Sequence, residues 1–594
     1  MTDSAQTAAK AVLKKLSQTV FYLYHHATKH TVESLFSGGH YLDWSNQPQP
    51  FRRYEGAMAC SLSRSLWTSP YSLFQVIELM YGASRAKGEY GATVQAPDEK
   101  FLSAFAFYSL SISAWKEIKG SGERWALRVN ASSGNLHPTE MHLLVHDLEG
   151  MEPGIYHYGA RNHNLERRAR GQQAQVVWRL VSGSQQCPPL VVCLNSIHWR
   201  EVWKYRSRGY RYCQHDMGHA LGAVTMAAAS LGWTSCAYAL FPDEAIELTL
   251  HLAGTDEVPA LVIGLWPLSE EYSLLRCAAS PYLVREADRY VDFAGFKQEL
   301  AACEVDLTIG RPNKLSGHIL QYPDVDQTYA ASRLTFHEWA EVCSAARKHR
   351  DENTRKIAAE SGLKIPYDSS HALAHDVDGK VHKTIRRRRS AVDMHYDRKM
   401  PLEDLAVILA AATRGFEADF QTSLPMVPGS GKDFQFVDLY VYAHRVTDLA
   451  PGVYYYNRYR QELEPRVLED VRELAKAVSC FQDIAADSCF TLSMVADFGE
   501  TLALFGERGY RIAHYEAGFI GQMLYLASTA LGYDATGIGC FVDDAINAFL
   551  EFPPGKEVIY NFTVGEALLD PRLTTLPSYE FADPALNLDT FPRS

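Results

Sequence analysis

Long hydrophobic runs are missing from this chain of 594 residues. No apolar stretch approaches the roughly 18 residues that cross a bilayer, so we expect no membrane span. The first residues also lack an apolar segment followed by a small-residue cleavage point, and we expect no secretory signal. Positive charge is in deficit, because the formal net charge is −12. This balance argues against a general nucleic-acid or membrane-surface binder, which is usually basic.

Regular cysteine spacing is absent too. The eleven cysteines form no CxxC pair and no repeating pattern. Such scattered cysteines are typical of reduced thiols rather than of a disulfide framework, and we expect a cytoplasmic protein. At 47% hydrophobic residues, the chain can nevertheless bury a large core.

One segment of the sequence is repeated in similar form. Residues 208–233 read RGYRYCQHDMGHALGAVTMAAASLGW, and residues 508–533 read RGYRIAHYEAGFIGQMLYLASTALGY. The two phrases keep register without a gap. A period this long indicates two copies of one whole domain rather than a solenoid. Length alone would suggest roughly three or four domains, and the repeat reduces this to two large ones.

Each copy presents the same order of predicted elements. In order, they are a helix (71–84, 401–415), a strand after a polar loop (141–148, 438–444), a strand after a Pro-Gly turn (154–158, 452–456), a buried strand (190–195, 490–496), the long repeated helix and a closing strand (260–266, 560–566). This order predicts an α+β fold, with helices packed on a mainly antiparallel sheet. The helix predicted over 510–532 is apolar nearly all round, which is typical of a buried helix.

The repeat also predicts a domain organisation. From the N-terminus, we expect a helical arm (1–50), a first domain (51–290), a more charged connector (291–375), a second domain (376–575) and a tail (576–594).

The copies differ first in a basic run, residues 386–390, which holds four arginines and a serine. Such a run can be a solvated linker. However, Arg388, Arg389 and Ser390 precede a helical pattern and suit a phosphate, because guanidinium groups make bidentate contacts and a hydroxyl adds a donor. Aligning the two predicted helices puts the Ala-Cys-Ser of residues 59–61 at the equivalent place, without arginines.

The second difference is a polar loop in copy one, where residues 131–138 read ASSGNLHP. Ser132, Ser133 and Asn135 offer short hydrogen-bonding groups, and the glycine permits close backbone approach to a planar polar ligand. The same residue types also make ordinary turns. Copy two has VPGSGK at residues 427–432 instead.

The third difference follows the long helix. Copy two has Gly537, Ile538, Gly539 and Cys540, where two glycines can expose backbone N–H groups to a ligand. Copy one has AYALF at residues 237–241, without either glycine. A Gly-x-Gly pattern is a weak signal by itself.

In this order, the motifs resemble those of the FMN-dependent nitroreductase superfamily, and look most like its SagB-type dehydrogenase branch in tandem duplication. The resemblance covers residues 50–290 and 376–575. It is carried by the Arg-Arg-Ser motif, the 132–138 loop, the two Gly-Tyr-Arg helices, the glycines after the second helix and a late VG…DPR run ending at Arg572. The family often has a basic residue two places after the serine, where this chain has Val392.

The resemblance implies an intramolecular pseudo-dimer with one intact FMN site. Family homodimers build each flavin site from both subunits: one supplies the Arg-Arg-Ser phosphate grip and amides near the flavin N5, and the other supplies the Ser-Ser-x-Asn loop. Here the first set lies in copy two and the second in copy one. The implied FMN contacts are Arg388, Arg389, Ser390 and Arg572 for the phosphate, Ser132, Ser133 and Asn135 for the pyrimidine or ribityl side, and Gly537, Ile538, Gly539 and Cys540 near N5.

Lys204 and Tyr205 are the catalytic candidates. In azoline-oxidising relatives, a Lys-Tyr pair at a similar place is thought to act as the base, and copy two has Leu504 and Phe505 there. Desolvation in a closed site would favour a lysine base. The alternative is a surface lysine beside a core tyrosine.

Other reactive residues favour structural interpretations. We expect the Cys540 thiol to be a small packing group, because no resolving cysteine is nearby in the sequence. His215 and His219 lie four apart on one helix face, but no third ligand is evident and we expect no metal. The repeated acids Asp216 and Glu516 are expected to pair with nearby arginines, Arg211 and Arg511, within or across the copies.

The sequence therefore predicts an FMN-dependent oxidoreductase acting on a small-molecule or peptide-derived substrate. One alternative is an NAD(P)H-dependent nitro or quinone reductase, since this family is expected to bind nicotinamide without a dinucleotide fingerprint. Another is a non-catalytic flavin-binding scaffold. A higher oligomer remains compatible with the pseudo-dimer.

Overall fold

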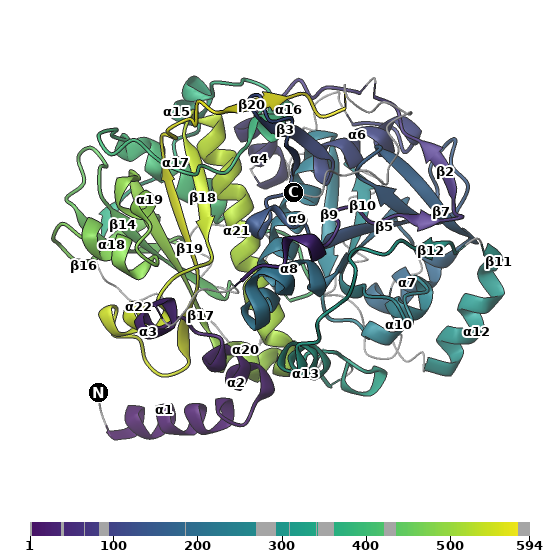
Figure 1. Ribbon diagram of the computed structural model, residues 1–594, viewed down its shortest axis with the longest axis horizontal. Helices are drawn as coiled ribbons and strands as arrows, with labels where there is room; N and C mark the ends of the chain where they lie inside the picture. Colours follow the sequence, from purple (N-terminus) through teal and green to yellow (C-terminus); the bar gives the residue numbers. More distant parts are fainter. Residues whose placement is uncertain are drawn as a thin grey trace.

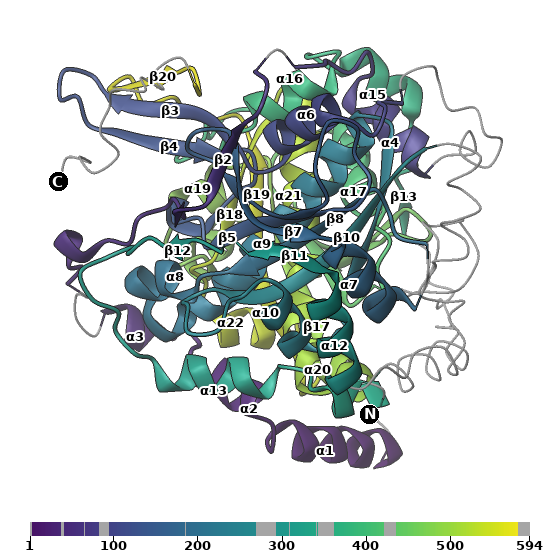
Figure 2. The same cartoon turned by 90° about the vertical axis from the view of Figure 1, so that its right-hand side faces the viewer.

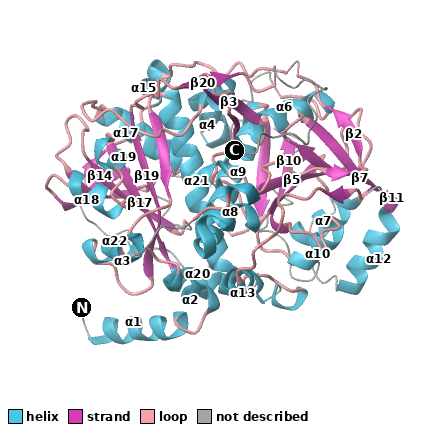
Figure 3. Ribbon diagram, viewed as in Figure 1, coloured by secondary structure: helices cyan, strands magenta, loops and turns pink. Residues whose placement is uncertain are grey.

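Two similar halves lie on either side of a pair of central helices in the computed structural model (Figure 1). The structure describes residues 3–36, 41–64, 66–81, 94–183, 186–268, 293–307, 309–339, 341–342, 362–420 and 435–579. Figure 3 shows one sheet in each half, with helices between and around them. The predicted α+β architecture, two domains with mainly antiparallel sheets flanked by helices, is confirmed.

The sheet of copy one is antiparallel throughout its described pairs. Its strand order is β11-β7-β6-β5-β8-β10-β9, and β2 also pairs with β7. The strands are β2 (Met58–Ser61), β5 (Thr139–Val145), β6 (Gly154–Gly159), β7 (Asn164–Gly171), β8 (Leu190–Ser196), β9 (Trp233–Tyr238), β10 (Val258–Pro267) and β11 (Glu304–Leu307).

Copy two repeats this topology, with the order β13-β16-β15-β14-β17-β19-β18. Its strands are β13 (Leu363–Lys364), β14 (Val437–Ala443), β15 (Gly452–Asn457), β16 (Glu462–Val467), β17 (Phe490–Asp497), β18 (Asp534–Ile538) and β19 (Lys556–Gly565). The predicted strands correspond to β5, β6, β8 and β10 in copy one and to β14, β15, β17 and β19 in copy two, whereas the sequence analysis predicted no strand at β7, β9, β16 or β18.

A small sheet joins the end of copy two to copy one. Strand β20 (Leu573–Leu576) pairs with β3 (Ile112–Ile118), which forms a hairpin with β4 (Arg124–Arg128). Figure 2 shows this sheet projecting from the upper part of the molecule. A second short pair, β1 (Tyr54–Glu55) with β12 (Arg311–Pro312), ties the connector to the first domain.

Helices cover the sheets and fill the space between them. In copy one and its flanking segments they are α1 (Asp3–Leu16), α2 (Val20–Ala27), α3 (Val32–Phe36), α4 (Leu73–Tyr81), α6 (Glu99–Ser109), α7 (Gln173–Ser182), α8 (His198–Tyr205), α9 (Gly209–Ser230), α10 (Asp243–Thr249), α12 (Phe293–Cys303) and α13 (Pro323–Ala331). In copy two they are α15 (Ser369–His375), α16 (Val381–Arg387), α17 (Leu402–Ala412), α18 (Arg472–Val478), α19 (Asp483–Asp487), α20 (Phe498–Phe505), α21 (Gly509–Ala530) and α22 (Asp543–Phe549). Within the described ranges, no helix has both the length and the apolarity to cross a membrane.

The helix of copy one that corresponds to α17 is α6. It packs on α9 as α17 packs on α21, whereas α4 lies among α15, α16 and α21. Aligning 71–84 with 401–415 was therefore wrong, because local apolar pattern does not reveal which helix packs on which. Residues 59–61 lie in β2 at the sheet edge. The segment that leads into α6 (82–93) and the VPGSGK of residues 427–432 are outside the described residues.

The two repeated helices cross at a pair of glycines. Every residue of α9 and α21 is buried, which confirms the predicted buried helix. A Cβ added at Gly218 would lie 2.2 Å from the carbonyl oxygen of Tyr515, and one added at Gly518 would lie 2.1 Å from that of His215. Only glycine permits the two backbones to approach this closely.

Two buried ion clusters flank the crossing, and each exchanges charge between the copies. Asp543 of copy two accepts hydrogen bonds from Arg208 and Arg211 of copy one, and Asp243 of copy one accepts them from Arg508 and Arg511 of copy two. The same arginines reach two further helices, because Arg211 donates to Thr28 after α2 and Arg511 donates to Ser332 after α13. The arm and the connector thus make equivalent contacts.

Gly518→Ala tests the crossing. We expect it to lower the free energy of unfolding by about 1–3 kcal/mol, because the added methyl group overpacks two helix backbones that cannot both move aside. Urea denaturation followed by circular dichroism measures this. Gly317→Ala is the control, since its Cβ would meet only the Asn46 side chain, at 3.3 Å. Equal stability of Gly518→Ala and the wild type would contradict the close crossing.

Candidate functional site

The boundary between the copies brings the sequence-predicted motifs together next to the helix crossing. Arg388 of copy two donates hydrogen bonds to the carbonyl oxygens of Arg128, at 3.0 Å, and Val129, at 3.1 Å, in copy one. Gln522 on α21 accepts one from the Ala131 amide at 3.2 Å. Copy two therefore grips the backbone that leads into the 131–138 loop.

Tyr525 connects the Arg-Arg-Ser motif to the glycine segment. Its hydroxyl lies 2.8 Å from Ser390 Oγ and accepts a hydrogen bond from the Gly537 amide at 3.0 Å. The Arg388 guanidinium lies over the Tyr525 ring, 4.9 Å from its centroid. The neighbouring Ile538 is buried in the core of copy two. The sequence comparison missed Tyr525, because copy one has threonine at the matching position of the repeat.

Gly539 faces copy one. Its carbonyl oxygen accepts hydrogen bonds from Arg208, at 3.1 Å, and from the Tyr212 hydroxyl, at 2.9 Å. A Cβ at Gly539 would lie 2.6 Å from the Tyr212 ring, so this position requires glycine. Within the described part of the chain, the backbone N–H groups of Gly539 and Cys540 have no recorded acceptor.

Lys204 and Tyr205, at the end of α8, lie against the polar loop. A Cβ at Gly134 would lie 2.5 Å from the Tyr205 hydroxyl and 3.0 Å from Lys204 Nζ. The Tyr205 ring packs edge-on against Tyr212, with centroids 4.6 Å apart. Burial, and then the negative charge of Glu201, raise the pKa of Tyr205 well above its usual range, so its hydroxyl keeps its proton.

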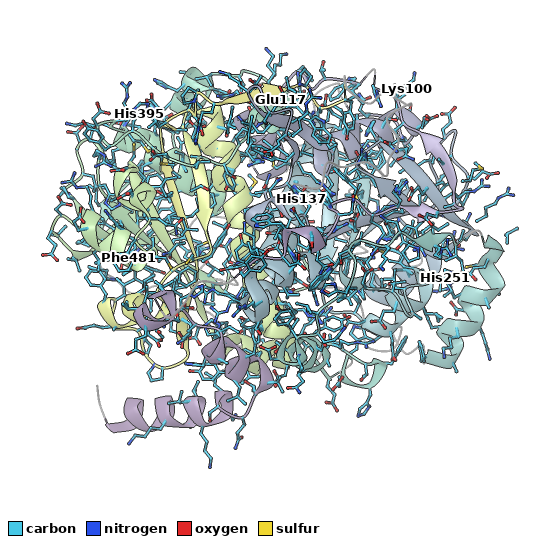
Figure 4. All side chains as sticks on the ribbon, viewed as in Figure 1. Lys100, Glu117, His137, His251, His395 and Phe481 are labelled. Atoms are coloured by element: carbon cyan, nitrogen blue, oxygen red, sulfur yellow. The ribbon has the colours of Figure 1, made fainter. Side chains whose placement is uncertain are left out.

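Polar side chains of the loop mainly hold the loop itself. Ser132 Oγ accepts from the His137 amide at 2.8 Å, and Asn135 Nδ2 donates to the Ala126 carbonyl at 2.8 Å. Ser133 donates to the Asp216 carboxylate through both its amide and its hydroxyl, each at 3.0 Å. Figure 4 labels His137 in the central region where the two halves meet.

Asp216 and Glu516 therefore do not pair with Arg211 and Arg511, contrary to the sequence prediction. Each acid accepts backbone N–H groups of the loop before its own sheet, since Glu516 binds the Phe436 amide at 2.9 Å. Arg211 forms its ion pair with Asp543 instead, and Arg511 forms its ion pair with Asp243. A linear pattern could not distinguish these partners, because both acids lie close to an arginine in sequence.

Two buried acids lie beneath the loop. Burial raises the pKa of Asp216 to about 7, although hydrogen bonds from Ser132 and Ser133 oppose the shift. Burial and the neighbouring charge of Asp216 raise the pKa of Glu201 well above its usual range. The pair can hold a proton near neutral pH.

A cluster of positive charge, buried at Arg388 and half-buried at Arg386 and Arg389, lies on the copy-two side. Among the described residues, no carboxylate forms an ion pair with Arg386, Arg388 or Arg389, whose hydrogen bonds go to neutral oxygens. Burial lowers the pKa of all three, and Lys116 on β3 has its pKa lowered by burial and by Arg389. Arg388 Nη1 is buried without a partner. Uncompensated buried cations favour an anionic ligand.

The contacts of Arg572 are separate from those of the arginine cluster. It pairs with Asp570 at 2.7 Å, and its side chain is 82% exposed. Its carbonyl oxygen accepts the Lys119 amide beside β3, so the residue is held on the small sheet.

In copy one, a side chain of the protein itself fills the position that is equivalent to the Gly539–Cys540 segment. Asp419, after α17, accepts the Ala239 amide at 2.9 Å and the Leu240 amide at 2.8 Å. These are the counterparts of the Gly539 and Cys540 amides. Phe416, three residues before Asp419, is buried, and its ring centroid lies 4.3 Å from that of Phe519.

The helix histidines are buried in an aromatic cluster. The His215 ring stacks on Tyr560 at 4.3 Å, and His219 Nε2 lies 3.1 Å from the Tyr560 hydroxyl. Burial lowers the pKa of both histidines. Across the described ranges, no group of three metal-ligating side chains is found.

Cys540 has a cysteine neighbour that is distant in sequence, Cys480.

The chain belongs to the nitroreductase family, a family of flavin-dependent oxidoreductases. Residues 123–265 and 385–566 match the family described as "Nitroreductase family", one segment in each copy. The crystal structure of an Anabaena variabilis protein that is described as a nitroreductase shares the fold, with a TM-score of 0.65 at 20% identity. The match covers 93% of this chain and 100% of that one, so it includes both copies.

Two curated relatives match parts of the chain. "Putative nitroreductase MJ1384" of Methanocaldococcus jannaschii is 28% identical over 177 residues, 29% of this chain and 84% of that protein. "Trifolitoxin-processing protein TfxB" of Rhizobium leguminosarum bv. trifolii is 30% identical over 132 residues. That match spans 20% of this chain and 34% of the relative.

Asp216→Asn tests the buried acid. In the folded state the pKa of Asp216, about 7, lies above the usual aspartate value, so the folded protein holds this proton more tightly than the unfolded chain does. The resulting contribution to folding stability is present at low pH and is lost as pH rises through about 7. We expect the wild type to lose on the order of 1–2 kcal/mol more unfolding free energy than the variant between about pH 5 and 8. Urea denaturation at both pH values measures it. Asp368→Asn, at the exposed N-cap of α15, is the control; equal slopes for wild type and Asp216→Asn would contradict the assignment.

Proposed function

We propose that the protein is an FMN-dependent oxidoreductase with one FMN per chain, acting on a small-molecule or peptide-derived substrate. The contrast between two loops carries this proposal. Asp419 takes the amides of Ala239 and Leu240 in copy one, whereas no acceptor is recorded among the described residues for those of Gly539 and Cys540 in copy two. One of two symmetry-related sites is thus left for a ligand.

The residues at the boundary fit FMN. Arg388, Arg389 and Ser390 would hold the phosphate, since the arginine cluster needs an anion and Arg388 Nη1 has no partner. Lys116, which the sequence comparison missed, would add a further cation from copy one. Arg572 would reach the phosphate only by leaving Asp570.

The flavin ring would lie between the copies. Ser132, Ser133 and Asn135 would line its polar side, and the segment from Gly537 to Cys540 would present backbone amides to its other side. Asn130 supports this placement, because both polar atoms of its buried side chain lack a partner. Such orphaned groups are rare unless a ligand or water satisfies them.

The catalytic candidates are Lys204 and Tyr205. When bound, FMN supplies reversible hydride transfer, and the protein supplies positioning and proton movement. Lys204 Nζ, at the polar loop, would take a proton from the substrate. Tyr205, whose pKa is raised by burial, would remain a hydrogen-bond donor beside it.

The SagB-type dehydrogenase branch supplies the finer proposal. The Lys-Tyr pair resembles that of azoline-oxidising members, and a partial relative is named as a trifolitoxin-processing protein. Both favour a peptide-derived substrate whose heterocycle is oxidised.

Flavin quantitation tests the single site. We expect one FMN per chain in the purified protein, measured by visible absorbance after denaturation, and two would contradict the proposal.

Arg389→Ala should weaken FMN binding about 10- to 100-fold, because it removes a charge-assisted contact to the phosphate. Arg472→Ala, whose exposed pair with Asp470 resembles that of Arg572, is the control. Arg572→Ala should weaken binding less than Arg389→Ala does.

Lys204→Ala tests the base. Turnover of an azoline-containing test peptide, followed by mass spectrometry, should fall about 10²- to 10⁴-fold while FMN occupancy stays constant. Lys297→Ala, which changes an exposed residue of α12, should leave turnover unchanged. Unchanged turnover in Lys204→Ala with FMN still bound would remove this residue from the mechanism.

A further inference from the structure

Two cysteines from distant parts of copy two meet at the edge of the candidate site. The Cys480 and Cys540 thiols influence each other electrostatically, and contacts of their neighbouring residues hold the two segments side by side. Both side chains are half-buried rather than enclosed. Cys480 precedes α19 and Cys540 ends the glycine segment, so the contact depends on the fold.

Backbone contacts fix the two segments on both sides of the thiols. The Val542 amide donates to the Val478 carbonyl at 2.8 Å. Gln482 Nε2 donates to the Cys540 carbonyl at 3.3 Å. Cys480 and Phe481 both adopt positive φ angles, 55° and 60°, a region that side chains other than those of Asn, Asp and His rarely occupy.

The surroundings of Cys540 favour its thiolate. The interaction with Cys480 is the largest influence; with His30 and Arg208, it lowers the pKa of Cys540 to about 5 against the effect of burial. The pKa of Cys480 is raised, so this thiol keeps its proton. A thiolate beside a protonated thiol is the arrangement of an attacking and a resolving cysteine.

Access separates this pair from the buried cysteines of the described residues. Cys193, Cys213, Cys236 and Cys489 are buried, and burial raises the pKa of each. Figure 4 shows Phe481, next to Cys480, in the copy-two half, and its side chain is 46% exposed. The loop that holds Cys480 therefore faces solvent at Phe481.

We propose that Cys480 and Cys540 form a redox-active dithiol that low-molecular-weight disulfides such as glutathione disulfide convert to an intramolecular disulfide. The Cys540 thiolate attacks one sulfur of the oxidant, which forms a mixed disulfide and expels one glutathione thiolate. Cys480 then loses its proton and attacks the Cys540 sulfur, which closes the bridge and expels the second thiolate. Two protein thiols are oxidised and one disulfide is reduced.

The bridge would act on the segment from Gly537 to Cys540. It removes the thiolate charge and ties the segment covalently to the loop before α19. This reaction needs no flavin, so its test is independent of the proposed function.

Disulfide mapping tests the proposal. The folded full-length chain is incubated with glutathione disulfide, its remaining thiols are alkylated, and digested peptides are analysed by mass spectrometry. We expect a linked Cys480–Cys540 peptide pair and protection of both residues from alkylation. Full alkylation of both residues in the treated wild type would overturn the proposal, and so would a bridge from either one to another cysteine.

Variants separate the two roles. Cys480→Ser should trap glutathione on Cys540, because the resolving thiol is gone, whereas Cys540→Ser should carry glutathione at neither position. Cys303→Ser, which removes another half-buried thiol, should still form the bridge. Glutathione on Cys480 rather than Cys540 in the single variants would overturn the assignment of roles. Since wild-type mapping needs no substitution, a misfolded variant would not remove the test.

Discussion

The contact between Gly218 and Gly518 sets the distance between the two copies. An added Cβ at either position would lie within 2.2 Å of a backbone oxygen on the other helix. This close approach allows α9 and α21 to bury every residue against each other and their sheets. It also places Arg208 within reach of both Asp543 and the Gly539 carbonyl. The geometry of the candidate site therefore depends on two residues that contribute no functional group.

Buried ion pairs give this contact its specificity rather than its strength. Desolvation of Arg211, Arg511 and their partners costs much of what their attraction returns, but loss of one partner leaves a charge buried alone. Because Asp543 serves arginines of copy one and Asp243 serves arginines of copy two, neither half satisfies its own charges. We infer that the copies are interdependent for folding, as subunits of an obligate dimer are.

Much of the fold was accessible from the sequence, because periodicity and the repeat are local signals. The antiparallel sheets and the buried helix were predicted from them and are confirmed. Pairings between distant segments were not accessible. The equivalence of α6 with α17, the partners of Asp216 and Glu516 and the contact of Cys480 with Cys540 depend on three-dimensional packing, and the sequence interpretation was wrong or silent on each. For the candidate site, the structure places the polar loop next to Tyr205 within copy one, and Arg388 of copy two binds the backbone before that loop. Their roles toward FMN stay predictions.

Duplication within one chain explains why such asymmetry can arise. In a homodimer, a substitution enters both sites at once, so a carboxylate that blocks one amide pair blocks the other as well. In a fused pair, the copies change independently. Asp419 can then occupy the amides of Ala239 and Leu240 and act as packing, while Gly539 and Cys540 keep theirs. The same independence allows Cys480 and Cys540 to occur in copy two alone, where Leu240 stands at the counterpart of Cys540. If the protein holds one FMN as proposed, fusion has converted two equivalent sites into one site with a supporting half.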